Sequence, residues 1–183
     1  LIIPAVWLML PAYTPSPAAS LFGGGKPIDF GMTLKDGKRI FGDGKTFRGL
    51  FGGTVFGLII GLIQMILVLN GFTLFNIQLP EFGNSFIGSV AVIFSLSFGS
   101  LLGDLCMSFL KRRLKLERGA PLPVIDQLDF VLGAWLLVYL ASPVWFVTHF
   151  TYKIIIIVLI LTPLLHISTN VIGFLIGVKK EPW

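Results

Sequence analysis

The chain has 183 residues, of which 55% are hydrophobic and only 13% charged, and its mean hydropathy is +0.89. A soluble domain of this length cannot bury so much apolar surface, so the composition excludes an ordinary water-soluble globular protein. The net charge of +5 is concentrated in a few short segments, and we expect membrane lipids, not nucleic acid, as the surroundings of the chain.

Five uncharged runs are each long enough to cross the hydrocarbon core of a bilayer, which takes about 20 apolar residues. The predicted fold is an all-α integral membrane protein with a single domain, residues 1–183. The expected spanning helices are residues 1–22, 49–70, 83–106, 129–148 and 153–178. The first should be bent, because it contains Pro4, Pro11, Pro15 and Pro17.

All but one of the 14 Lys and Arg residues lie in three segments, residues 26–48, 111–118 and 179–180. Five crossings place these segments on one side of the membrane, and the positive-inside rule makes that side cytoplasmic. We therefore expect a multi-pass protein of the cell membrane, with its amino terminus outside and its carboxyl terminus inside. The two cytoplasmic loops, residues 23–48 and 107–128, should form the active site.

The first loop begins Gly23-Gly24-Gly25-Lys26-Pro27-Ile28-Asp29 and ends Gly42-Asp43-Gly44-Lys45-Thr46-Phe47-Arg48. Backbone amides of glycine can approach a nucleotide closely. Asp36-Gly37, between these stretches, predicts a tight turn. Gly44-Lys45-Thr46 is not part of a Walker loop, because Arg39 stands where that pattern requires glycine.

Lys45, Thr46 and Arg48 gather at the start of the second helix, where the helix dipole favours phosphate. We assign Lys45 and Arg48 to phosphate binding. The alternative is an ordinary group of positive charges against lipid head groups, and we favour it for Lys35, Lys38 and Arg39.

The second helix carries Gly49, Gly53, Gly57 and Gly61 at intervals of four, so they form one stripe of small residues. Such a stripe lets two membrane helices approach closely. The close contact lies either within the bundle or between the two protomers of a homodimer.

The third helix carries a polar stripe that ends near the cytoplasmic boundary: Ser97, Ser100, Asp104, Ser108 and Lys111. An ionisable side chain at such a boundary is a functional candidate by default, and here it is Asp104. The single cysteine, Cys106, excludes an internal disulfide and is interpreted as a small packing residue.

Asp126 and Asp129 lie three residues apart at the start of the fourth helix, so both can face Asp104. Carboxylates that converge repel one another unless a cation joins them, and oxygen ligands favour Mg²⁺. The alternatives are that Asp126 and Asp129 cap the fourth helix, and that Asp104 pairs with Lys111 or Arg112.

Acidic side chains for Mg²⁺, cationic ones for phosphates and bare glycine amides at a membrane surface favour phosphoryl or nucleotidyl transfer onto a lipid. Such reactions depend on positioning and charge neutralisation more than on covalent chemistry. Lys111 and Arg112 are placed beside the acidic residues, where a polyphosphate would bind.

These motifs resemble those of the CTP-dependent lipid cytidylyltransferases. The phosphatidate cytidylyltransferase signature is matched by Gly103-Asp104-Leu105, Ser108, Lys111-Arg112, Pro123, Asp126 and Asp129, with Gly44-Lys45-Thr46 and Gly49 as a second motif. The smaller archaeal branch, the CDP-archaeol synthases, is more similar over nearly the whole chain, through Gly23–Gly31, Gly42–Thr46 and Asp126–Phe130. The bacterial signature has Gly-His-Gly-Gly where this chain has Leu122–Ile125, so the lipid contacts of the larger family are not carried over.

The resemblance implies an Mg²⁺-dependent nucleotidyltransferase that converts CTP and an isoprenoid ether-lipid phosphate, 2,3-di-O-geranylgeranylglyceryl phosphate, into CDP-archaeol and pyrophosphate. The catalytic residues are then Asp104, Lys111, Asp126 and Asp129, with the three aspartates on Mg²⁺. Arg112 joins Lys45 and Arg48 on the phosphates. The other expected substrate-binding residues are Gly23, Gly24, Gly25, Pro27, Asp29, Asp43, Gly44 and Thr46, with the Gly23–Asp29 segment on the cytidine.

Two alternatives stay open. A CDP-alcohol phosphotransferase also uses aspartates and magnesium, but it would show four closely spaced aspartates, whereas Asp36-Gly37 lies in a basic loop. A small anion transporter would place charge near the bilayer midplane and interrupt paired helices, whereas the predicted midplane here is nearly free of charge.

Overall fold

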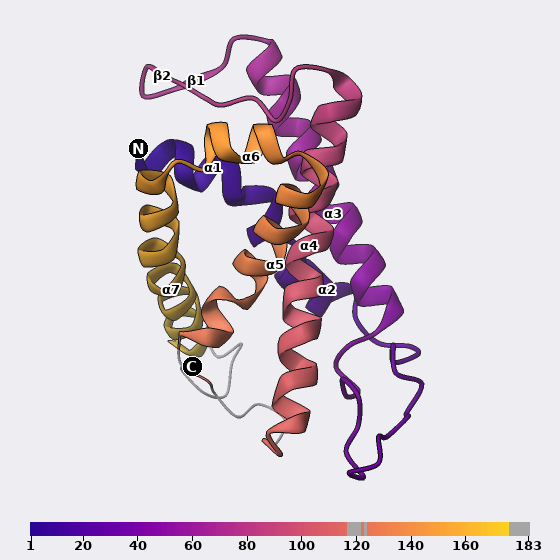
Figure 1. Cartoon of the computed structure of the whole chain (residues 1–183). Helices are drawn as coiled ribbons and strands as arrows, with labels where there is room; N and C mark the ends of the chain where they lie inside the picture. Colours follow the sequence, from indigo (N-terminus) through magenta and orange to yellow (C-terminus); the bar gives the residue numbers. More distant parts are fainter. Residues whose placement is uncertain (117–121, 123, 176–183) are drawn as a thin grey trace.

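The computed structural model describes residues 1–116, 122 and 124–175 (Figure 1). That part of the chain is mostly helical. Its helices are α1 (Ile2–Tyr13), α2 (Pro15–Phe22), α3 (Phe47–Leu69), α4 (Phe86–Arg113), α5 (Ile125–Ala141), α6 (Pro143–His149) and α7 (Tyr152–Leu175). Part of the predicted loop 107–128, the last residues of the predicted helix 153–178 and the basic pair 179–180 lie outside the described residues.

Proline divides the first and fourth predicted helices. The expected bend in the first helix lies at Thr14, and Pro15 starts α2 because proline, which has no N–H, is tolerated in the first turn of a helix. The predicted helix 129–148 is two helices, since α5 begins earlier, at Ile125, and α6 starts at Pro143.

A short hairpin was not predicted from the sequence. Strands β1 (Thr73–Leu74) and β2 (Ile77–Gln78) pair antiparallel. Phe75 and Asn76, between them, both have positive φ, the backbone geometry of a two-residue turn that matches the twist of the strands.

Length and composition make α3 and α4 capable of crossing a membrane within the described residues. A third span results if α6 and the first part of α7 are taken together, although they meet at a bend of 78°. The chain before α3 is divided at Thr14 into two short helices, and α5 has only 17 residues, so neither segment forms one helix long enough to cross a membrane. Five crossings therefore stay a prediction.

The glycine stripe of α3 packs inside the bundle. All four glycines are buried. A methyl group on Gly53 would lie 2.6 Å from the Pro15 carbonyl oxygen, and one on Gly57 would lie 2.6 Å from Ser97 Oγ. The stripe is thus covered by the α1–α2 segment and by α4 of the same chain, so it does not support a homodimer.

Helices α4 and α5 also approach through glycine. A methyl group on Gly103 would collide with the Asp129 carbonyl oxygen, and one on Gly133 would collide with the Gly99 carbonyl oxygen. Because Gly103 precedes Asp104, this contact brings Asp104 to the beginning of α5.

Apolar side chains form a core between α1, α4, α5 and α7 and also cover the outside of the bundle. The most buried core residues include Leu8, Met9, Val92, Ile93, Leu96, Val131, Val138 and Val158. Large apolar side chains such as Leu21, Ile87 and Val144 are at least 80% exposed, which suits a protein whose solvent is largely lipid. Cys106 is exposed on α4 and is not the packing residue that we expected.

The hairpin and the long loop between α2 and α3 lie at opposite ends of the bundle (Figure 1). Helix α4 runs from the first end to the second, where its last turn lies beside that loop. The candidate residues are therefore held at one end of the molecule.

Candidate active site

The loop between α2 and α3 is folded. A bridge between Pro27 and Thr46 closes it, and a second bridge, between Thr33 and Arg39, forms its tip, where the predicted Asp36-Gly37 turn lies. The Ile28 N–H also donates to the Lys45 carbonyl oxygen at 2.8 Å. We call residues 27–46 the lobe.

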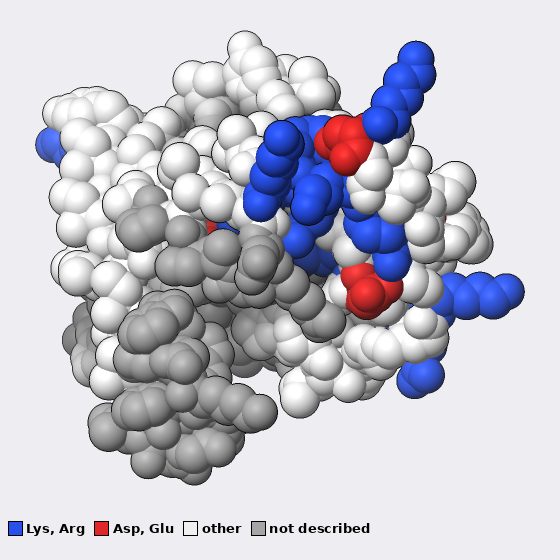
Figure 2. Space-filling view, turned by 90° about the horizontal axis from the view of Figure 1, so that it is seen from below, with Lys and Arg blue, Asp and Glu red and all other residues white. Residues whose placement is uncertain are grey.

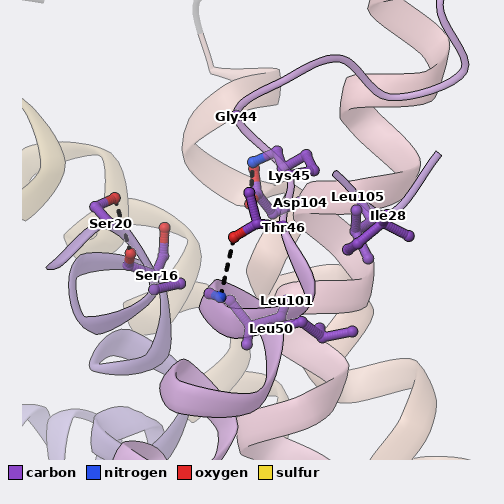
Figure 3. A pocket seen from close by; sticks show the side chains of 12 residues that line it. Ser16, Ser20, Ile28, Gly44, Lys45, Thr46, Leu50, Leu101, Asp104 and Leu105 are labelled. Atoms are coloured by element: carbon purple, nitrogen blue, oxygen red, sulfur yellow. Dashed lines mark hydrogen bonds and ion pairs between the residues drawn. The ribbon is translucent and has the colours of Figure 1, made fainter. Parts of the chain in front are cut away.

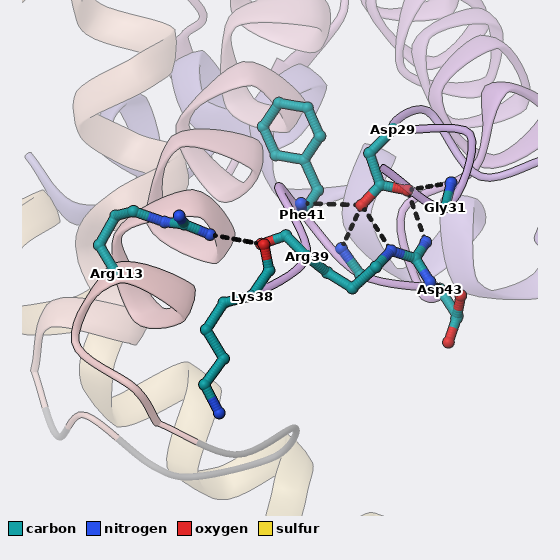
Figure 4. Close-up of polar contacts among 8 residues, drawn as sticks. Asp29, Gly31, Lys38, Arg39, Phe41, Asp43 and Arg113 are labelled. Atoms are coloured by element: carbon teal, nitrogen blue, oxygen red, sulfur yellow. Dashed lines mark hydrogen bonds and ion pairs between the residues drawn. The ribbon is translucent and has the colours of Figure 1, made fainter. Parts of the chain in front are cut away.

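Asp29 is the centre of the lobe (Figure 4). Its carboxylate is buried and accepts hydrogen bonds from the backbone N–H groups of Gly31, Phe41 and Gly42 at 2.9–3.1 Å. Arg39 adds Nε at 3.2 Å and Nη2 at 2.5 Å. The Arg39 guanidinium and these amides hold the pKa of Asp29 well below its usual range. Asp29 is therefore a scaffold of the lobe and not the cytidine contact that the sequence suggested.

Both ion pairs of Arg39 are with residues of the lobe. Its Nη1 donates to Asp43 Oδ1 at 2.6 Å, so the guanidinium bridges a buried and an exposed carboxylate. Arg39 therefore does not have the role that we favoured for it, a positive charge lying against lipid head groups. Asp43 lies at the surface of the lobe and holds Arg39 from outside.

The side chain of Lys45, near the end of the lobe, extends to α4 and forms an ion pair with Asp104 (Figure 3). Thr46, next in the chain, is buried and caps α3, because its Oγ1 accepts the Gly49 N–H at 3.1 Å. The pair lies on a cavity of about 70 Å³ between α2, α3 and α4. Its polar lining includes Ser16, Ser20, Lys45, Thr46 and Asp104.

Three glycines precede the lobe, and the last of them, Gly25, approaches Arg48. Gly24 and Gly25 have φ values of +96° and +78°, in the region that favours glycine. A methyl group on Gly25 would lie 3.1 Å from Arg48 Cδ. Gly23 is the C-cap residue of α2, Pro27 pairs with the α3 N-cap residue Thr46, and Gly44 lies two residues before Thr46.

Asp126 pairs with Lys111 of α4, whose Nζ lies 2.6 Å from Asp126 Oδ2. The same oxygen accepts the Leu122 N–H at 2.9 Å. Val124 is the N-cap residue of α5 and makes no side-chain cap hydrogen bond, so neither aspartate is the N-cap, although Asp126 lies in the first turn. Asp126 Oδ1 is buried and has no hydrogen-bond partner among the residues that the structure describes.

Arg112 and Asp129 complete the predicted set. Arg112 Nη1 donates to the Leu116 carbonyl oxygen at 3.0 Å, and its buried Nε has no hydrogen-bond partner in the described part of the chain. Asp129 accepts the Phe130 N–H, and its carbonyl oxygen lies against Gly103, the residue before Asp104. Asp104 pairs with Lys45 instead of Lys111 or Arg112, and one shared site for the three aspartates stays a prediction.

The end of the molecule that carries this site is strongly basic. Figure 2 looks onto it and shows Lys and Arg side chains gathered over one part of the face, with a few acidic groups among them. Such a face attracts polyanionic ligands.

The model of the CarS-like, CDP-archaeol synthase family matches residues 1–183. The chain belongs to this family. It is 61% identical over 175 residues to the CDP-archaeol synthase of Methanococcoides burtonii and 56% identical to that of Methanosarcina barkeri, covering 96% of this chain and all of each relative. A solved structure of an intramembrane enzyme for archaeal membrane lipid biosynthesis has a TM-score of 0.69 and 32% identity, covering 93% of this chain and 95% of that one.

In this CDP-archaeol synthase family member, the donor set at the three aspartates suits Mg²⁺. These side chains offer carboxylate oxygens, and the buried Asp126 Oδ1 has no hydrogen-bond partner within the described residues. Within the described residues, no three Asp, Glu, His or Cys side chains converge closely enough to hold a metal alone. The fit is thus to an ion held by one or two carboxylates together with substrate phosphates.

Sequence reasoning missed Arg113 and Asp36. Arg113 Nη1 lies 2.7 Å from Asp36 Oδ2, and Nη2 donates to the Arg39 carbonyl oxygen at 2.6 Å. The run Lys111-Arg112-Arg113 predicts that the end of the helix is basic. It does not indicate which of the three side chains binds the lobe. That choice depends on how the helix turns toward a loop more than 70 residues away.

Proposed function

We propose that this protein transfers CMP from CTP to 2,3-di-O-geranylgeranylglyceryl phosphate and so produces CDP-archaeol and pyrophosphate. Membership of the CDP-archaeol synthase family over the full chain is the observation that carries the proposal. The basic face at the end of an apolar bundle supports it, because one substrate is a free triphosphate and the other a lipid phosphate.

In the proposed reaction, an oxygen of the lipid phosphate attacks the α-phosphorus of CTP. The bond to the bridging oxygen between the α- and β-phosphates breaks, and pyrophosphate leaves. No separate general base is needed, because the nucleophile is already an anion. Lys45, Arg48, Lys111 and Arg112 would neutralise the phosphates, and the glycines before the lobe would offer backbone amides.

One or two of the carboxylates of Asp104, Asp126 and Asp129 would hold Mg²⁺ together with the substrate phosphates. When bound there, the ion would supply charge neutralisation of the triphosphate. Lys45 and Lys111 already neutralise two of these carboxylates through their ion pairs. Substrate binding therefore requires each lysine to exchange a carboxylate for a phosphate.

The proposal includes five crossings of the cell membrane, with the lobe on the cytoplasmic side and the amino terminus outside. The concentration of basic residues in the lobe and at the end of α4 supports this orientation. CTP is then drawn from the cytoplasm, and the prenyl chains lie among the helices.

The test is transfer of radiolabelled CMP from CTP to the lipid phosphate by purified protein with Mg²⁺. Asp126→Asn should lower turnover by roughly 100-fold or more, because it removes a charge that organises both the ion and Lys111. Glu81→Gln, the same change at the opposite end of the bundle, is the matched control and should retain activity.

The rival functions give other products in the same assay. A CDP-alcohol phosphotransferase would release CMP from a CDP-lipid and no pyrophosphate from CTP. An anion transporter would move a labelled anion across vesicles without consuming CTP. Either result with the unaltered protein would contradict the proposed function, as would normal turnover by Asp126→Asn.

A further inference from the structure

The lobe is attached to α4 at two places. Lys45 pairs with Asp104, and nine residues further along the helix Arg113 binds the tip of the lobe. The Arg113 guanidinium donates to the Asp36 carboxylate at 2.7 Å and to the carbonyl oxygens of Lys38 and Arg39 at 3.3 and 2.6 Å. Figure 4 shows the Arg113 side chain pointing toward the backbone at Lys38 and Arg39. The guanidinium also lies 5.2 Å from the centre of the Phe109 ring.

Between these two attachments the lobe is cross-linked by hydrogen bonds and ion pairs. The backbone of Arg39 accepts from Arg113, while its side chain holds the buried Asp29. Asp29 in turn accepts the Gly42 N–H, two residues before Gly44 and three before Lys45. The contacts form a closed ring that leaves α4 at Arg113 and returns to it at Asp104.

We propose that Arg113 is a positioning residue for the nucleotide site, because it docks the lobe on α4 and thereby sets where Lys45 lies relative to Asp104. This inference rests on the proposed function for its kinetic consequence. Arg113 acts through the lobe, and its side chain is engaged by lobe acceptors instead of the cavity. The planar guanidinium of Arg113 contacts three oxygen acceptors and the Phe109 ring at the same time. A lysine ammonium cannot reproduce this set of contacts, so lysine is not an equivalent replacement.

The kinetic test compares Arg113→Met with Lys115→Met, which removes the same charge from an exposed position two residues away. Arg113→Met should raise the KM for CTP roughly tenfold or more through loss of charged hydrogen bonds. The KM for the lipid phosphate should change little. Lys115→Met should leave both constants near those of the unaltered protein, and Arg113→Lys should recover only part of the loss. Equal KM values for CTP in the two methionine variants would overturn the inference.

A structural test does not depend on activity. Spin labels at Lys35→Cys and Leu114→Cys, in a Cys106→Ala background, report the distance from lobe to α4 by pulsed electron paramagnetic resonance. Arg113→Met should broaden this distance distribution, while exchange of the Phe41 and Gly42 amides stays slow because the lobe remains folded around Asp29. An unchanged distribution, or fast exchange showing that the lobe has unfolded, would refute a positioning role. If the unaltered protein transfers no CMP, the proposed function fails and this distance measurement alone decides the docking role.

Discussion

At the scale of single residues, the site is arranged as two lysine–carboxylate pairs. The side chains of Lys45 and Asp104 are 26% and 28% exposed, and those of Lys111 and Asp126 are 16% and 25% exposed. Partly buried carboxylates are costly without a cation, so these lysines stabilise the site before substrate binds. The same lysines are the proposed phosphate ligands, which makes their carboxylate pairs a competitor of substrate binding.

Lys45→Met should therefore affect two ligands in opposite directions. With the lysine gone, Asp104 lacks its cation, so Mn²⁺ binding without nucleotide, followed by electron paramagnetic resonance, should tighten several-fold. Binding of CTP should weaken by roughly tenfold, because one charged contact to phosphate is lost.

Lys35→Met, an exposed lysine of the same lobe, is the control for charge loss alone. It should leave Mn²⁺ binding unchanged. Weaker binding of both Mn²⁺ and CTP by Lys45→Met would contradict competition and indicate that Lys45 only holds the fold.

At the scale of elements, glycine contacts set the spacing of the helices that carry the acidic residues. Gly99, Gly103 and Gly133 bring the backbones of α4 and α5 together, and Asp104 and Asp129 flank that contact. A helix interior ordinarily disfavours glycine by about 1 kcal/mol relative to alanine, so these positions sacrifice helix propensity for close approach.

Replacing glycine by alanine inside a helix ordinarily stabilises a protein, but Gly103→Ala should destabilise this one. The added methyl collides with the α5 backbone, and we expect a loss of about 1–3 kcal/mol in the free energy of unfolding, measured by thermal denaturation in detergent. Gly88→Ala, near the start of α4, meets only Ser85 Oγ at 3.1 Å and should be neutral or slightly stabilising. Equal stability of the two variants would show that the α4–α5 contact relaxes freely.

At the scale of the whole molecule, charge and apolar surface are separated along the bundle. The lobe and the end of α4 carry the basic face, whereas the hairpin lies at the opposite end (Figures 1 and 2). This separation is the basis of the proposed orientation, in which the positive-inside rule places the basic end toward the cytoplasm.

Single cysteines can test this orientation in a Cys106→Ala background. Phe75→Cys, at the exposed hairpin turn, should react with a membrane-impermeant maleimide added to intact cells. Lys38→Cys, in the lobe, should react only after the membrane is permeabilised. Labelling of the lobe from outside would reverse the proposed topology.

Much of the site could be named from sequence because its chemistry is local. Asp104 and Asp129 were expected to lie near each other, and the structure places Gly103, next to Asp104, against the Asp129 carbonyl oxygen; a site shared with Asp126 stays a prediction. The partners of these residues could not be named: Lys45 and Asp104 are 59 residues apart, and the pairing depends on how the lobe folds. Asp29 was misassigned because the sequence does not show that five donors converge on it.

The sequence alone indicated that the chain belongs in a bilayer, that its first helix is bent and at which end its charges gather. These properties depend on how each segment is solvated and on the fixed φ and missing N–H of proline. Neither depends on contacts with distant parts of the chain. Only the tertiary structure decided that the glycine stripe is internal, that Asp29 is a scaffold and that Arg113 holds the lobe. Those roles depend on distances between segments far apart in the chain, because a hydrogen bond or ion pair exists only where packing brings both groups together.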